Sequence, residues 1–167
     1  MNIERPLAGM ARLALAAVLC AVPLGCQRGP GPTTAADATL SPDEQVLLTL
    51  DCYNPQYKID EDGHVTDLNL GWRHLPGPVL AEIDKLTELE HIDLAYTTVT
   101  DDGLVQLKDL QKLRSMGLTG TPVTDKGLDH LEKMPNLQWV WLPRERVTEA
   151  AVERLKEARP DMHIYLQ

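Results

Sequence analysis

Apolar residues return every 24 positions through the second half of the chain. The stretch 86–109 reads LTELEHIDLAYTTVTDDGLVQLKD, and the stretch 110–133 reads LQKLRSMGLTGTPVTDKGLDHLEK. Both copies contain L-x-x-L-x-x-(I/M)-x-L followed by T-x-V-T-D-x-G-L-x-x-L. A repeat of this length is typical of a solenoid, in which each unit buries its apolar face against its neighbours.

The same phase continues on both sides of these two copies. Four apolar columns keep a 24-residue step: Leu68, Ile92, Met116, Val140, Ile164; Leu70, Leu94, Leu118, Leu142, Leu166; Leu75, Val99, Val123, Val147; and Leu80, Leu104, Leu128, Val152. The alternation around each L-x-L predicts a short strand, and the G-L-x-x-L spacing predicts a short helix. Each threonine before the acidic residue stands where a helix N-cap belongs, and the repeated glycines predict close approach of the neighbouring turn.

These repeats resemble the leucine-rich repeat family, in particular its short bacterial V-T-D-x-G-L variety, which is similar to the ribonuclease-inhibitor-like class. The resemblance covers residues 65–167. It implies an α/β leucine-rich repeat solenoid with about five short parallel strands on the concave side and four short helices on the convex side. Because members of this family mostly bind other proteins and few are enzymes, the resemblance also implies a non-enzymatic protein-binding module.

Residues 41–64 are predicted to form an N-terminal cap on this solenoid. Ser41, Pro42 and Glu44 occupy the N-cap, first and third positions of a helix, which is the pattern of a capping box. We expect this helix to run to about Leu50 and to cover the open end of the stack, since terminal repeats need a cap. A strand, an acidic turn at 60–63 and a second strand follow.

The first 26 residues are expected to be a signal peptide. An apolar run of 12 residues, 13–24, follows Arg5 and Arg12 and is too short to cross a bilayer. Gly25 and Cys26 end it in a sequence that resembles a bacterial lipobox, which implies lipidation of Cys26; ordinary signal cleavage is the alternative. Residues 27–40 are poor in large apolar side chains and predict a flexible linker. The protein is therefore expected to be exported and anchored by lipid to a bacterial membrane, or else secreted or periplasmic after cleavage.

The acidic composition excludes some classes of partner. The chain has 25 acidic and 16 basic residues, for a net charge of −9. Phosphate backbones require a basic surface, so we expect no nucleic acid partner, and we expect contact with a membrane only through the lipid anchor. Cys52 is the one cysteine beyond Cys26, and it could form a disulfide with Cys26 if that residue is not lipidated.

Residues that alternate with the apolar columns are expected to face outward on the concave side. They form two columns: Asp67, His91, Ser115, Trp139, His163, and Asn69, Asp93, Gly117, Trp141, Tyr165. Large aromatic residues beside Ser115 and Gly117 predict a platform that borders a shallow depression. We therefore predict a protein-binding surface made of Trp139, Trp141, Tyr165, His163, His91 and Asp93. Two alternatives stay open: stacking of a glycan in an envelope protein, and aromatic packing that only completes the end of the solenoid.

Catalytic and metal chemistry are weakly indicated. Asp67, His91 and Ser115 follow the order Asp-His-Ser on successive strands, but an open sheet face offers no oxyanion hole and no enclosure. The acidic turn at 60–63 lacks the glutamate that closes a calcium loop. There is no Gly-rich phosphate loop, no C-x-x-C and no H-E-x-x-H. We therefore predict no enzyme activity, no cofactor and no metal.

Overall fold

The computed structural model describes residues 40–167. The predicted signal peptide, with Cys26, and all of the predicted linker except Leu40 lie outside the described residues. The described elements are α2 (Pro42–Leu50), η3 (Asp51–Tyr53), β1 (Gln56–Ile59), β2 (Val65–Asn69), α3 (Gly77–Ile83), β3 (His91–Asp93), α4 (Asp101–Val105), β4 (Ser115–Gly117), α5 (Asp125–Leu131), β5 (Trp139–Leu142), α6 (Glu149–Ala158) and β6 (His163–Leu166).

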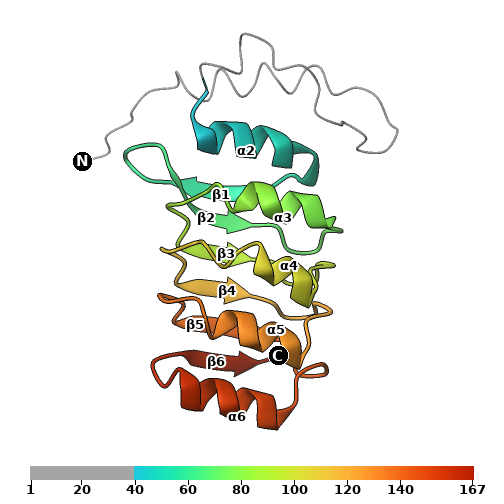
Figure 1. Ribbon diagram of the computed structural model, residues 1–167. Coiled ribbons are helices and arrows are strands. Elements are labelled where there is room, and N and C mark those ends of the chain that lie inside the picture. Colours follow the sequence, from blue (N-terminus) through green and yellow to red (C-terminus); the bar gives the residue numbers. More distant parts are fainter. Residues whose placement is uncertain (1–39) are drawn as a thin grey trace, which may run out of the picture. The chain divides into compact units, whose positions relative to one another are not determined.

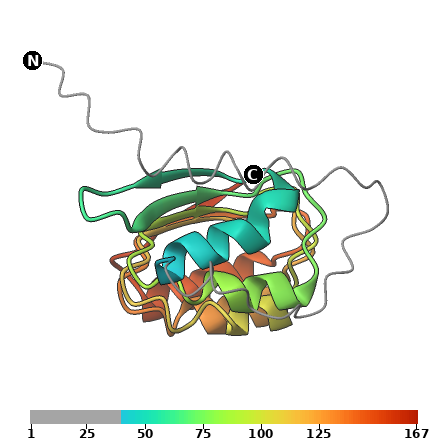
Figure 2. The same cartoon turned by 90° about the horizontal axis from the view of Figure 1, so that it is seen from above.

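The six strands form one sheet in the order β1-β2-β3-β4-β5-β6 (Figure 1). Strand β1 pairs antiparallel with β2, and every later pair is parallel. Helices α3 to α6 form a second layer on one face of the sheet, while α2 lies at the β1 end of the stack (Figures 1 and 2). This is a leucine-rich repeat solenoid with five parallel strands, four helices and a capping helix, as the sequence predicts.

The strand register follows the 24-residue repeat without a slip. Leu68 pairs with Ile92, Ile92 with Met116, Met116 with Val140, and Val140 with Ile164. The apolar columns between Leu68 and Val152 are at most 9% exposed and form one continuous core. Leu166 departs from its column at 37% exposed, because β6 is the edge strand and no further described strand covers it.

The capping helix α2 is held by the predicted capping box. The Ser41 backbone N–H donates to Glu44 Oε2 at 2.8 Å, and the Glu44 N–H donates to Ser41 Oγ at 3.1 Å. Val46, Leu47 and Leu50 are buried against the first repeat. The buried Asp43 carboxylate also accepts a hydrogen bond of 2.7 Å from the Val65 N–H, so the cap is joined to β2 by a polar contact as well as by packing.

All three threonines at the helix starts occupy the predicted N-cap positions, but only one of them caps its helix with its side chain. Thr100 and Thr124 occupy N-cap positions, but neither side chain caps its own helix; only Thr148 does so, by accepting from the Ala151 N–H at 3.2 Å. Instead, the Asp101 carboxylate accepts from both the N–H and the hydroxyl of Thr124 in the next repeat. The T-D dipeptide therefore joins neighbouring repeats, because the aspartate of one repeat accepts hydrogen bonds from the threonine of the next.

The glycine column marks close approach between repeats, as predicted. A Cβ added at Gly103 would stand 2.6 Å from Leu80 Cδ1, and one at Gly127 would stand 2.6 Å from both Asp101 Oδ1 and Val123 Cγ1. Glycine weakens a helix by about 1 kcal/mol relative to alanine. Its presence here is explained by the short distance between stacked turns. Within residues 40–167, no helix has the length and hydropathy needed to cross a membrane.

Candidate functional site

The polar face of the sheet carries the two predicted outward columns; we call it the concave face. Asp67, His91, Ser115, Trp139 and His163 are in register across β2 to β6, as are Asn69, Asp93, Gly117, Trp141 and Tyr165. All ten residues are half-buried or exposed. The tertiary structure thus brings the six predicted binding residues onto one surface, and whether they bind a partner stays a prediction.

The aromatic residues of β5 and β6 stack in pairs. The rings of Trp141 and Tyr165 lie 5.4 Å apart, centroid to centroid, at 16°, and those of Trp139 and His163 lie 6.2 Å apart at 17°. Tyr165 remains 45% exposed. The pairs therefore do two things at once: they pack against each other at the edge of the sheet, and they leave aromatic surface open to solvent.

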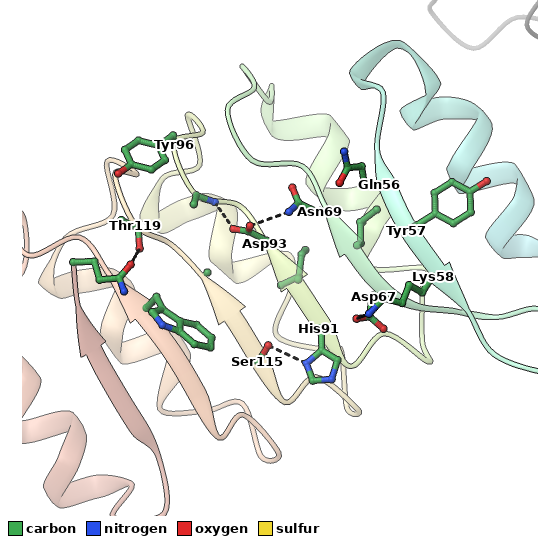
Figure 3. A pocket seen from close by; sticks show the side chains of 16 residues that line it. Gln56, Tyr57, Lys58, Asp67, Asn69, His91, Asp93, Tyr96, Ser115 and Thr119 are labelled. Atoms are coloured by element: carbon green, nitrogen blue, oxygen red, sulfur yellow. Dashed lines mark hydrogen bonds and ion pairs between the residues drawn. The ribbon is translucent and has the colours of Figure 1, made fainter.

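A depression of about 690 Å³ extends over the polar face of the sheet from β1 to β5, with Trp141 at its β5 side. Figure 3 shows the side chains that line it. Strand β4 contributes only small residues to the lining, Ser115 and Gly117, while Trp141 comes from the strand on one side of β4 and Asp93 from the strand on the other. The full lining of the depression is Gln56, Tyr57, Lys58, Asp67, Leu68, Asn69, His91, Ile92, Asp93, Ala95, Tyr96, Ser115, Gly117, Thr119, Trp141 and Gln167. On the Trp141 side of the depression, small residues of β4 thus lie between larger residues of β3 and β5.

Asp93 is oriented by two neutral donors. Its Oδ1 accepts from the Ala95 N–H at 3.0 Å, and its Oδ2 accepts from Asn69 Nδ2 at 3.0 Å (Figure 3). The Asn69 side chain is itself held, because its Oδ1 accepts from the Gly71 N–H at 3.0 Å. Asn69 and Asp93 therefore present fixed acceptors and donors at one side of the depression.

Asp67 is engaged by a cation. Lys58 Nζ, from β1, lies 3.0 Å from Asp67 Oδ1, and the Thr66 hydroxyl donates to Oδ2 at 3.0 Å. Burial alone would raise the pKa of Asp67, but the hydrogen bonds from Lys58 and Thr66 outweigh it, so the pKa of this carboxyl lies below its usual value. The carboxylate is thus ionised and paired at neutral pH.

The Asp-His-Ser order on successive strands is only partly realised in space. His91 Nδ1 lies 2.9 Å from Ser115 Oγ. A dashed line marks this contact in Figure 3. The hydrogen bonds of Asp67 go to Lys58 and Thr66, not to His91. The Ser115 N–H donates to the Glu90 carbonyl and is not directed at the space above the hydroxyl. The geometry of a nucleophilic triad, with an oriented base and an oxyanion hole, is not assembled by these residues.

Two exposed aromatic residues were missed by the sequence reasoning. Trp72 and Tyr96 are 77% and 48% exposed, and their rings stack at 3.9 Å and 16°. Both have a left-handed backbone, with φ of 64° and 55°, and Gly120 repeats this with φ of 67°. A Cβ at Gly120 would lie 2.5 Å from the Tyr96 ring, so the ring occupies space that is free because residue 120 has no side chain. Positions 72, 96 and 120 are 24 residues apart, so the repeat itself could have indicated that Trp72 and Tyr96 are neighbours.

The described residues contain no group of three His, Cys, Asp or Glu side chains arranged to hold a metal ion. In the acidic turn, Asp60 Oδ1 accepts from the N–H groups of Asp62 and His64. Those bonds, that of His64 above all, lower the pKa of Asp60. The carboxylate thus stabilises its own turn.

The chain matches no protein-family profile and no curated protein. Among solved structures it is similar to the leiomodin-1 actin-binding site 2, with a TM-score of 0.53, 14% identity, and coverage of 81% of this chain and 80% of that one. It is also similar to an internalin from Listeria monocytogenes str. 4b F2365, with a TM-score of 0.37 and 14% identity over 52% of this chain and 30% of that one. At 14% identity, the similarity to the leiomodin-1 domain concerns the fold alone.

Proposed function

We propose that this protein is a non-enzymatic protein-binding module that engages its partner through the concave face. The observation that carries the proposal is the depression on the concave face, which is lined by Trp141 on β5 and by Tyr96 in the loop after β3 among others. Partly exposed tryptophan and tyrosine are enriched at the centres of protein interfaces, where they bury much area at little cost in conformational entropy. Single exposed aromatics are common, but this protein has two stacked pairs on β5 and β6 and a third pair, Trp72 and Tyr96, and each of two pairs contributes one residue, Trp141 or Tyr96, to the lining of the depression.

A solved structure of similar fold also supports a protein partner. The leiomodin-1 domain is described as an actin-binding site, so a solenoid of similar extent presents a surface for a protein. The identity of this protein's partner is a separate question, because the residues of the concave face are its own.

The proposal includes a tether outside the cytoplasm. The sequence of residues 1–26 supports an exported protein with lipid on Cys26, and the linker at 27–40 would let the repeat domain reach partners away from the membrane. Metabolic labelling with a palmitate analogue tests this part. Label in the unmodified chain and none in Cys26→Ser is expected; label in neither would restrict the proposal to the binding module.

The binding module is tested by capture of envelope proteins on the immobilised protein. The test variant is Trp139→Ala/Trp141→Ala, and the matched control is Lys126→Ala on the exposed side of α5. We expect one or more proteins to be retained by the unmodified chain and by the control but lost by the double variant. Thermal unfolding of all three is measured in parallel. Capture that is equal for folded forms of all three would refute the concave site.

A glycan is the second candidate ligand. It is favoured by one observation, namely that Trp141 shares its depression with the fixed polar groups of Asn69 and Asp93. An aromatic face beside carboxylate and carboxamide groups suits a ring that has one apolar face and several hydroxyls. Retention on immobilised envelope glycan by the unmodified protein, with no protein partner captured, would favour this candidate.

A further inference from the structure

Asp93 is the uncompensated charge of the depression. Apart from His91, which contacts Ser115, the charged residues of the lining are Lys58, Asp67 and Asp93. Lys58 and Asp67 form an ion pair with each other. Asp93 accepts hydrogen bonds from the Ala95 N–H and from Asn69, which are both neutral, and within residues 40–167 no basic side chain forms an ion pair with it. The depression therefore carries a net negative charge at a defined point.

That charge lies close to an aromatic ring across a position without a side chain. Asp93 Oδ1 stands 2.7 Å from the point where a Cβ of Gly117 would be, so the carboxylate leans over β4. Trp141 occupies the same register position on the next strand, about 4.8 Å further along. Tyr165 stacks on Trp141 from the β6 side and does not line the depression, which leaves the β4 side of the indole toward the hollow.

We infer that this hollow binds a cationic side chain, lysine or arginine, presented by the protein partner. The inference rests on the proposed function and names the chemistry of its central contact. A cation within about 6 Å of an indole ring gains a cation–π interaction, and a carboxylate binds it at about 2.8 Å. One cation can make both contacts as long as the carboxylate oxygen and the ring centroid are no more than about 9 Å apart, the sum of the two distances. Asp93 on β3 leans over Gly117 on β4 toward Trp141 on β5, which brings the two groups toward each other.

The charge of Asp93 distinguishes this occupant from a neutral one. A neutral partner surface that closed over the hollow would bury an ionised carboxylate without a counter-ion, which is costly. A cationic side chain removes that cost. The net charge of the chain, −9, also favours encounters with basic partners over acidic ones.

The test uses small probes of known charge with the protein itself. Three probes are titrated separately: Nα-acetyl-lysine amide, Nα-acetyl-arginine amide and the neutral Nα-acetyl-citrulline amide. Binding is followed by NMR at the backbone amides of Ala95 and Gly117 and at the Trp141 indole N–H. The two cations are expected to shift all three signals saturably, in a manner that weakens with added salt, and citrulline is expected not to. The probe that binds with the higher affinity identifies whether the partner presents lysine or arginine.

Three variants locate the contact. Asp93→Asn should weaken cation binding about tenfold, the ratio expected for loss of a charge-assisted contact. Trp141→Leu should weaken it about threefold by removing the cation–π interaction. Asp129→Asn changes the net charge equally from an exposed position on α5 and should leave binding unchanged.

The inference is overturned if citrulline binds as well as arginine, or if Asp93→Asn retains both its spectrum and full cation affinity. Its failure is separable from that of the proposed function. Partner capture that depends on Trp139 and Trp141, with no probe binding, rejects the cationic contact alone. Probe binding without any partner captured through the concave face would overturn the protein-binding proposal and leave a cation site.

Discussion

Asp125 receives two hydrogen bonds from Thr148 in the following repeat, at 2.7 Å from the backbone nitrogen and at 2.8 Å from the hydroxyl. Asp101 makes the same pair of bonds to Thr124, at 2.8 and 2.7 Å. Two contacts of identical geometry, one repeat apart, show that the T-D dipeptide is an inter-repeat contact. It adds directional polar bonds to a stack that otherwise depends on apolar packing.

Removal of this contact should destabilise the stack. Asp101→Ala deprives the Thr124 N–H and hydroxyl of their acceptor, and we expect a loss of about 2 kcal/mol in the free energy of unfolding. Asp102→Ala is the matched control, since it removes an acidic residue from the same first turn of α4 at an exposed position. The control should cost less than about 1 kcal/mol. Urea unfolding of the three proteins measures both values; equal losses would show that only the helix dipole is involved.

The same contact should make stability depend on pH in the acidic range. The hydrogen bonds from the Thr148 backbone and hydroxyl lower the pKa of Asp125. The stabilisation is therefore complete above the pKa of the unfolded carboxyl, about 4, and is lost as the pH falls through the lower pKa of the folded state. Unmodified protein should melt higher than Asp125→Asn at pH 7, and the two should converge at the acid end of a titration of Tm. A constant difference at all pH values would contradict this.

Gly127 should not tolerate a methyl group. A Cβ would stand 2.6 Å from Asp101 Oδ1, the same atom that accepts from the Thr124 N–H. We expect Gly127→Ala to cost about 1–3 kcal/mol, as overpacking does. Gly77→Ala is the control, because nothing lies within 4 Å of its added Cβ, and it should be neutral or stabilise by up to about 1 kcal/mol. Thermal unfolding of both variants measures these changes. If Gly127→Ala left the stability unchanged, the neighbouring repeats would have to move apart at little cost in free energy.

Trp72 should contribute little to stability despite its size. It is 77% exposed and adopts a left-handed backbone, which costs a bulky residue roughly 1–2 kcal/mol. Glycine would remove that strain while losing a ring stack of about 1 kcal/mol, so Trp72→Gly should leave the free energy of unfolding nearly unchanged. Chemical unfolding measures this. A loss above about 2 kcal/mol would assign Trp72 to the folded core, whereas unchanged stability with weaker partner capture would extend the binding surface to this pair.

Prediction from the sequence succeeded for the features that repeat along the chain, namely which residues are buried and which face outward. Ile92 and Met116 had to be buried, and Asp93 and Gly117 had to face away from them, because residues alternate between the two faces of a strand and the repeat keeps the register. Ser115 and Gly117 do line a depression next to Trp141, as predicted, but its larger part, over β1 to β3, was not predicted. The charge of the depression could not be predicted from the sequence, because the ion pair of Lys58 with Asp67 depends on β1, which is outside the repeat.

The sequence by itself determined the solenoid, its strand register, the cap at Ser41 and the composition of the concave face, since each depends on spacing along the chain. Only the tertiary structure decided that Asp101 binds Thr124 of the next repeat, that Trp72 and Tyr96 stack outside the predicted columns, and that Asp93 is the unpaired charge beside Trp141. These relationships depend on side-chain directions and backbone conformation where neighbouring repeats meet. A one-dimensional pattern records which residues are neighbours but not which atoms of those neighbours come into contact.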